Sequence, residues 1–309
     1  MSNAARPDHA KAVLAMVVAT LLWSVAGVVT RQLHQQNGLV LVFWRSSFTV
    51  LAVLAWLAWS QGLRRAWVDV RGASHLLWLS AFFWGVMFTA FMVALTLTSV
   101  AQTLLTDSLS PLIAAVLGWL LLRHRLPGRT WAAIALAMLG MGWMVWHDLQ
   151  SPTSSMQLLG MLIALAVPIA AASNWVSLRR AGSGVPMQAA VLIGALLSAL
   201  AVALPAWPVG VDLHDLFWLG FLGVFQLAAP GLLAVWAAQR LAPAEVGLLG
   251  LLETMFGTLW AWLGAGEQPS RGTLIGGALV LTALAANELL GWHRTRRRTV
   301  HTWLDAETP

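Results

Sequence analysis

Long apolar runs alternate with short polar intervals along the whole chain. Each run is roughly 18–25 residues long, which is the length that an α-helix needs to cross about 30 Å of hydrocarbon. No interval is long enough to hold a soluble domain. The pattern predicts an all-α membrane protein with ten transmembrane helices, near residues 12–31, 39–60, 74–95, 98–122, 130–147, 157–178, 187–206, 215–239, 243–264 and 272–292.

Basic residues fall mainly in alternate intervals. If the N-terminus is cytoplasmic, only Arg31 and Arg271 of the 18 lysines and arginines lie in outside loops, and only Arg45 lies within a span. Because cytoplasmic loops of membrane proteins are enriched in basic residues, this split supports an even number of spans with both termini in the cytoplasm. The first run lacks a small-residue cleavage site, so we expect it to remain as an anchor in the inner (plasma) membrane.

Composition narrows the classes of function. Hydrophobic residues make up 59% of the chain and charged residues 10%, against about 25% charged residues in soluble domains. The chain has no cysteine, and its one lysine, Lys11, precedes the first span. A Walker A lysine, a retinal Schiff base and a cysteine metal site are therefore excluded. An HExxH motif is also absent, so we expect no cofactor, no bound metal and no nucleic-acid partner.

The two halves of the chain show the same organisation. Residues 110–140 align with residues 253–283: each stretch has a span, a polar break and a second span rich in Ala and Gly. Five helices per half is an odd number, so the second half enters the membrane inverted, an arrangement typical of transporters with a site between the halves. We expect one repeat in 1–150, its inverted copy in 151–293 and a basic cytoplasmic tail in 294–309.

Four short stretches follow one another in an order typical of one transporter group. They are LLWS (21–24), FWRSS (43–47), SLSPLIAAVLGWLL (108–121) and LLETMFGTLWAWLGAGEQ (251–268). In these stretches the chain resembles the drug/metabolite transporter superfamily, and more narrowly its EamA-type members with ten spans in two halves. The sequence departs from the family pattern at Thr254, where the family has a proline, and at His124, where it has an acidic residue.

The resemblance implies a transporter that moves small organic metabolites, often outward, and amino-acid exporters of the YddG type are the most similar subgroup. It also implies a central cavity lined by the first, third, fourth, sixth, eighth and ninth spans. The fifth and tenth spans are expected at the periphery.

Two carboxylates lie deep in predicted spans. Asp107 is close to the middle of the fourth span, one turn before the helix-bending Pro111, and Glu253 is deep in the ninth. A charge at the bilayer centre costs at least about 2.5 kcal/mol, so each faces protein, water or a ligand. They either bind an amine, a cation or a proton, or form structural hydrogen bonds, for example with Ser108. Arg45 could bind a substrate carboxylate, pair with a protein carboxylate or extend its guanidinium outward to the membrane surface (snorkelling). The last two are favoured.

Neutral candidates complete the predicted site. The chain has 19 tryptophans and no tyrosine, and an indole face suits aromatic or cationic ligands as well as plain packing. Asn174 and Gln226 could bind the amino or carboxyl group of a substrate, or hold helices together. With the two carboxylates, the predicted substrate-binding residues are Trp23, Trp78, Asn174, Trp175 and Gln226.

The sequence is therefore interpreted as a secondary transporter or facilitator, with no catalytic residues, that exports amino acids by alternating access. The alternatives are export of another metabolite or an organic cation, or an intramembrane enzyme. An enzyme would need a nucleophile–base pair, but the eight histidines lie in loops or at span ends. The expected partners are a small-molecule substrate and the lipid bilayer, and the chain is taken to act as a monomer.

Overall fold

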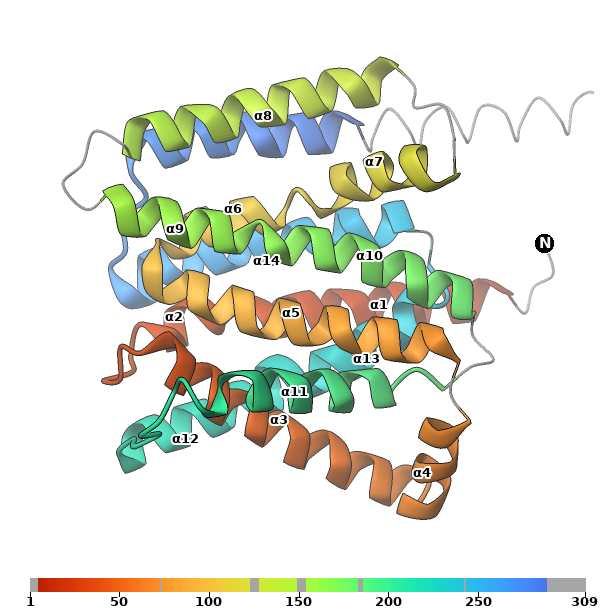
Figure 1. The fold of residues 1–309 in the computed structure, drawn as a ribbon. Coiled ribbons are helices and arrows are strands. Elements are labelled where there is room, and N and C mark those ends of the chain that lie inside the picture. Colours follow the sequence, from red (N-terminus) through yellow and green to blue (C-terminus); the bar gives the residue numbers. More distant parts are fainter. Residues whose placement is uncertain are drawn as a thin grey trace, which may run out of the picture.

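The computed structural model describes residues 5–72, 74–122, 128–148, 154–182, 186–241 and 243–287 (Figure 1). Helices occupy all ten predicted spans within these ranges, which confirms an all-α membrane protein with ten spans in two inverted five-helix repeats. The basic break at Arg123–Arg125 and the predicted tail 294–309 lie outside the described residues.

Six spans are single helices and four are divided. The single helices are α3 (Gly38–Ser60), α5 (His75–Leu97), α8 (Gly128–Asp148), α11 (Ala189–Ala203), α14 (Pro243–Ala265) and the helix Arg271–Asn287. The divided spans are α1 (Ala5–Ser24) with α2 (Ala26–Thr30), α6 (Val100–Asp107) with α7 (Ser110–Leu122), α9 (Ser154–Ala164) with α10 (Ala166–Ala181), and α12 (Leu213–Phe221) with the π-helix η1 (Leu222–Ala228) and α13 (Ala229–Ala238). Among the described residues, five continuous segments are long and apolar enough to cross a membrane by themselves: Asp8–Thr30, Gly38–Ser60, His75–Leu97, Ser155–Ala181 and Leu213–Ala238.

Proline accounts for three of the four divisions. A proline has no N–H to donate to the carbonyl four residues earlier, and its ring crowds that carbonyl. Pro111 follows the α6–α7 junction, and the Ser110 hydroxyl donates to the Asp107 carbonyl at 2.7 Å in place of the missing bond. Pro168 follows the α9–α10 junction, and Pro230 follows η1, where the helix widens to a π-helix. The first span divides at Val25 without a proline.

The two repeats pack against each other through equivalent helices. α5 packs against α11, and α3 packs against η1. α3 and α11 are the second spans of their repeats, and α5 and the span containing η1 are the third spans. Each contact therefore joins the second span of one repeat to the third span of the other. Glycines allow both approaches, because a Cβ at Gly194 of α11 would lie 2.5 Å from Trp84 Cβ, and one at Gly223 of η1 would lie 2.5 Å from Phe48 Cβ. Backbones that approach this closely are typical of small-residue helix contacts in membranes.

The fifth and tenth spans pair at the edge of the bundle, as the resemblance implied. Figure 1 shows α8 beside the helix Arg271–Asn287 along the upper edge. Ala133 and Ala137 of α8 are buried in this contact region, and a Cβ on Gly140 would lie 2.6 Å from the Gly276 carbonyl oxygen. These small residues therefore allow the two helices to pack closely.

The interval 61–73, read from the sequence as a polar connection, contains a further helix, α4 (Leu63–Arg71). Its apolar side chains Leu63, Trp67 and Val68 are each more than half exposed. The Arg71 guanidinium lies over the Trp67 ring, 4.8 Å from its centre. A short helix with exposed aromatic and basic residues at the end of a bundle suits the membrane interface. We name this side of the molecule the α4 end, and the opposite side, where α2 finishes, the Arg31 end (Figure 1).

Candidate substrate-binding cavity

A cavity of about 90 Å³ lies between the two repeats. Its walls come from α1, α3, α5 and the α6–α7 junction of the first repeat, and from α10, η1 and α14 of the second. The α6–α7 junction and η1 are places where a span departs from regular α-helix. Breaks in transmembrane helices are tolerated where they line a cavity or are buried in protein, because only there can the freed backbone groups find partners.

Asp107 and Glu253 both line this cavity, as predicted. Asp107 is the last residue of α6, and Glu253 lies in the middle of α14. The Ser110 hydroxyl donates to Asp107 Oδ1 at 3.3 Å, and the two carboxylates are close enough to interact electrostatically. Two neighbouring negative charges in a largely apolar surrounding create a strong demand for a cation, a proton or water.

The α6–α7 break is held against α14. The Thr254 hydroxyl of α14 donates to the Leu104 carbonyl at 3.2 Å. A Cβ at Gly247 would lie 2.7 Å from the Pro111 ring, so only a residue without a side chain allows this approach. The carboxylate of Glu253 thus lies on a helix that is fixed directly to the bend carrying Asp107.

Aromatic side chains form much of the remaining wall. Trp84 packs edge-on against Trp175, with ring centres 5.8 Å apart, and contacts Trp23 at 6.4 Å and Phe88 at 5.3 Å. All four line the cavity and are at most 9% exposed. Such a cluster offers both ring faces and edges to an apolar or cationic ligand.

The prediction for Arg45 is wrong in its favoured form. Arg45 is fully buried, so it does not snorkel, and no carboxylate of the described residues pairs with it. Its guanidinium donates to the Phe88 carbonyl at 2.5 Å and to Gln226 Oε1 at 3.4 Å. Arg45 also lines the cavity, so the second span contributes to the wall, whereas the resemblance implied only six other spans.

Five of the seven predicted site residues meet at the cavity: Asp107, Glu253, Trp23, Trp175 and Gln226. The other two lie outside its lining. Asn174 is fully buried and accepts a hydrogen bond from the Ser80 hydroxyl at 2.6 Å, and Trp78 is 51% exposed on α5. The sequence showed how deep these residues lie in their spans but not which helix face points inward.

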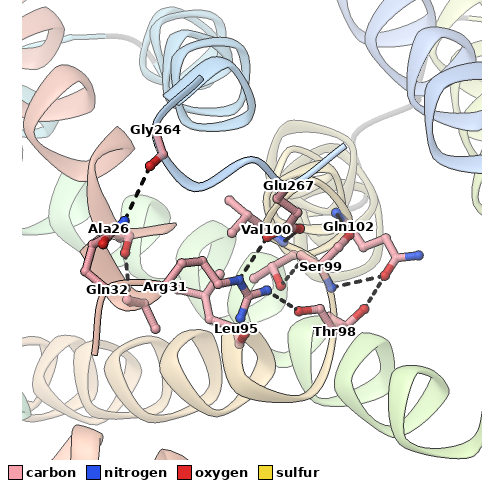
Figure 2. A network of polar contacts seen from close by, with 12 residues as sticks. Ala26, Arg31, Gln32, Leu95, Thr98, Ser99, Val100, Gln102, Gly264 and Glu267 are labelled. Carbon is pink, nitrogen blue, oxygen red and sulfur yellow. Dashed lines mark hydrogen bonds and ion pairs between the residues drawn. The ribbon is translucent and has the colours of Figure 1, made fainter. Parts of the chain in front are cut away.

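A polar network joins the two repeats at the Arg31 end (Figure 2). Arg31 Nε pairs with Glu267 Oε2 at 2.9 Å, and the same guanidinium donates to the carbonyls of Leu95 and Thr98 at 2.7 and 2.8 Å. Glu267 Oε1 accepts from the Val100 N–H at 2.7 Å. The cation therefore satisfies carbonyls at the C-terminus of α5, and the anion satisfies an N–H at the N-terminus of α6, each at the helix end whose dipole favours it.

A second polar group lies at the same end and was missed in the sequence. His34 Nδ1 lies 2.8 Å from Asp212 Oδ2, His214 Nδ1 lies 3.2 Å from Asp215 Oδ1, and the two imidazoles stack with centres 4.5 Å apart. The hydrogen bond and charge of Asp212 raise the pKa of His34, and the bond from the Asp215 N–H together with His34 lowers the pKa of Asp212. Potential ligand atoms of the four residues lie within 4.8 Å of one another, so they could hold a divalent metal, but only by displacing these hydrogen bonds. His34 and Asp212 are about 180 positions apart, and no local spacing signals such a group.

An all-α membrane protein with two inverted repeats around a charged cavity has the architecture of a secondary transporter. The comparisons define the family: the model of the EamA-like transporter family matches residues 10–146 and 158–287, and the chain belongs to this family. This membership confirms the resemblance to EamA-type transporters seen in the sequence.

Two further similarities agree with this assignment. An uncharacterized transporter of Vibrio cholerae serotype O1 (strain ATCC 39315 / El Tor Inaba N16961) is 29% identical over 143 residues, which span 44% of this chain and 45% of that protein. The match thus spans less than half the length of this relative. The structure is also similar to a crystal structure of another protein, with a TM-score of 0.63 and 22% sequence identity. The matched region covers 91% of this chain and 98% of that chain. The latter similarity concerns the fold alone.

Proposed function

We propose that the protein is a secondary transporter that moves amino acids outward across the inner membrane by alternating access. The observation that carries the proposal is the pair of neighbouring carboxylates, Asp107 and Glu253, in an aromatic cavity between the repeats. The ammonium group of an amino acid would neutralise this negative charge, and its side chain would lie against the tryptophans. An uncharged sugar could donate hydroxyl hydrogen bonds to such a pair but would not neutralise its charge.

The contacts at the Arg31 end of the bundle support one conformation of an alternating-access cycle. At the Arg31 end, the Arg31–Glu267 network and the His34–Asp212 pair connect the repeats, and neither group contributes to the cavity wall. Small-molecule sites usually enclose about 300–1,000 Å³, so a cavity of about 90 Å³ must widen before it holds a metabolite. Rocking of the repeats 1–150 and 151–293 would widen it, and one chain contains both moving parts, so a monomer suffices.

The second candidate function is export of an organic cation. The observation that favours it is the excess of two carboxylates over one guanidinium in the cavity wall. An intramembrane enzyme has less support, because the family is one of transporters.

Counterflow in proteoliposomes tests the proposed function. The purified protein is reconstituted with a panel of labelled amino acids, sugars and organic cations, and vesicles without protein serve as the control. We expect counterflow of at least one class of amino acid. Counterflow of cations without a carboxyl group, with none for any amino acid, would favour the second candidate.

We also propose that both termini are cytoplasmic, with the tail 294–309 on the same side. The absence of native cysteine allows a clean test with Gln36→Cys and Ser60→Cys, which change exposed residues at the two ends of α3: Gln36 lies two residues before the helix and Ser60 is its last residue. In intact cells, an impermeant maleimide should label Gln36→Cys, and it should label Ser60→Cys only after the membrane is permeabilised. The reverse labelling pattern would contradict the orientation.

A further inference from the structure

Arg45 is a buried cation with incomplete hydrogen bonding. Its side chain is fully buried, and within the described part of the chain its Nε–H has no hydrogen-bond partner. Within the described part of the chain its two hydrogen bonds go to neutral oxygens, the Phe88 carbonyl and the Gln226 side chain, and the second is long at 3.4 Å. A buried guanidinium without an anion is costly, because neutral acceptors replace only part of its hydration. The site therefore lacks a negative partner.

Trp84 presents a second donor on the same wall. Its indole is 1% exposed, and its Nε1–H has no hydrogen-bond partner among the described residues. Buried indole N–H groups usually find an acceptor, because a buried donor without a hydrogen bond is costly. Trp84 and Phe88 lie one turn apart on α5, and Arg45 donates to the Phe88 carbonyl. Both unsatisfied residues line the cavity.

The positive and negative groups of the cavity are on different helices and are not paired. Arg45 lies on α3 and bonds to α5 and η1, whereas Asp107 and Glu253 lie on the α6–α7 junction and α14. A protein ion pair would satisfy both charges, but the fold keeps them apart. A ligand that carries both a cation and an anion would satisfy them together.

We propose that Arg45 and the indole N–H of Trp84 form an anion subsite that binds the carboxylate of the transported molecule. The proposal rests on the proposed function, since it assigns the other end of an amino acid whose ammonium lies at Asp107 and Glu253. A carboxylate fits because its planar oxygens match the guanidinium fork and it carries one charge. A phosphate would require several cations, and among the described residues that line the cavity Arg45 is the one lysine or arginine.

Four probes with the same aromatic body separate the two ends of the ligand: L-phenylalanine, L-phenylalanine amide, 2-phenylethylamine and 3-phenylpropionate. An aromatic body is chosen because tryptophans line the cavity. Each probe is measured by counterflow in proteoliposomes and by thermal stabilisation of the purified protein. The variants are Trp84→Phe, which keeps an aromatic ring and removes the N–H, and Arg45→Lys, which keeps the charge and removes the planar fork. Trp59→Phe, an 87% exposed position on α3, is the matched control.

We expect Trp84→Phe to raise the half-saturating concentration of L-phenylalanine about tenfold, the effect of losing one hydrogen bond to a charged group. Arg45→Lys should raise the half-saturating concentration of L-phenylalanine by at least the same factor. Neither variant should change the values for the amide or for 2-phenylethylamine by more than about twofold, and Trp59→Phe should change none of them.

The outcomes separate the subsite from the proposed function. If Trp84→Phe raises the half-saturating concentrations of L-phenylalanine, its amide and 2-phenylethylamine equally, the indole acts by packing. This result would overturn the subsite, while the proposal of amino-acid transport would stand. The wild-type protein could instead transport 3-phenylpropionate and not L-phenylalanine, with Trp84→Phe raising the half-saturating concentration of 3-phenylpropionate about tenfold. This result would support the subsite and contradict amino-acid export. If neither carboxylate probe is transported or stabilises the wild-type protein, the subsite is overturned.

Discussion

Asp107→Asn should reduce counterflow of the transported amino acid at least tenfold, which corresponds to about 1.4 kcal/mol, with no change in the amount of folded protein. The substitution keeps the size of the side chain and leaves an oxygen that can accept a hydrogen bond from Ser110. In the wild-type protein the Ser110 hydroxyl lies 3.3 Å from Asp107 Oδ1. It removes the negative charge that the ligand ammonium would neutralise. Asp8→Asn makes the same chemical change at an exposed position near the N-terminus and should be neutral.

Glu253→Gln extends the test to the neighbouring carboxylate. If Glu253 carries a coupling proton, Glu253→Gln should lose transport driven by a pH gradient and keep substrate exchange. Both measurements use the same proteoliposomes at several pH values. Normal transport by both variants across this range would mean that the carboxylates are structural. The binding chemistry would then lie with neutral groups such as Gln226 and the tryptophans.

The second large effect is expected at the contact between α5 and α11. A Cβ at Gly194 would lie 2.5 Å from Trp84 Cβ, 2.8 Å from the Ala81 carbonyl oxygen and 3.1 Å from the Gly85 N. Two of these three atoms are backbone, so the helices themselves must separate. Gly194→Ala should therefore destabilise the protein by about 1–3 kcal/mol, the usual cost of overpacking a core. This exceeds the gain of up to about 1 kcal/mol from replacing a helical glycine with alanine.

Gly142→Ala on α8 is the matched control, because a Cβ there meets nothing within 4 Å. It should keep or slightly raise the thermal midpoint of the purified protein in detergent, while Gly194→Ala lowers it. Equal midpoints for the two variants would show that α5 and α11 can separate without cost. Because Trp84 is on the cavity wall, Gly194→Ala should also weaken substrate binding in the protein that folds.

The cavity itself was predictable in part. Asp107 and Glu253 were found from sequence because charge within an apolar run is costly, and that cost depends only on depth in the span. Gln226 and Trp175 were predicted from their depth in spans that the resemblance assigns to the cavity, but so were Asn174 and Trp78, which the structure places outside the cavity lining. Depth is readable from position in a run, whereas the direction of a side chain depends on the rotation of its helix. That rotation is set by packing against neighbours such as Ser80 and Gly194.

Hydrophobic length alone determined the ten spans, since a helix must bury its backbone polar groups through the whole apolar layer. The odd number of spans per repeat then required the second half to be inverted. Only the tertiary structure decided which charges pair. Arg31 meets Glu267 and His34 meets Asp212 across the two repeats, while Arg45 stays without a carboxylate partner among the described residues. These pairings join residues some 180 to 240 positions apart, and they follow from the orientation of whole helices, which no local sequence pattern encodes.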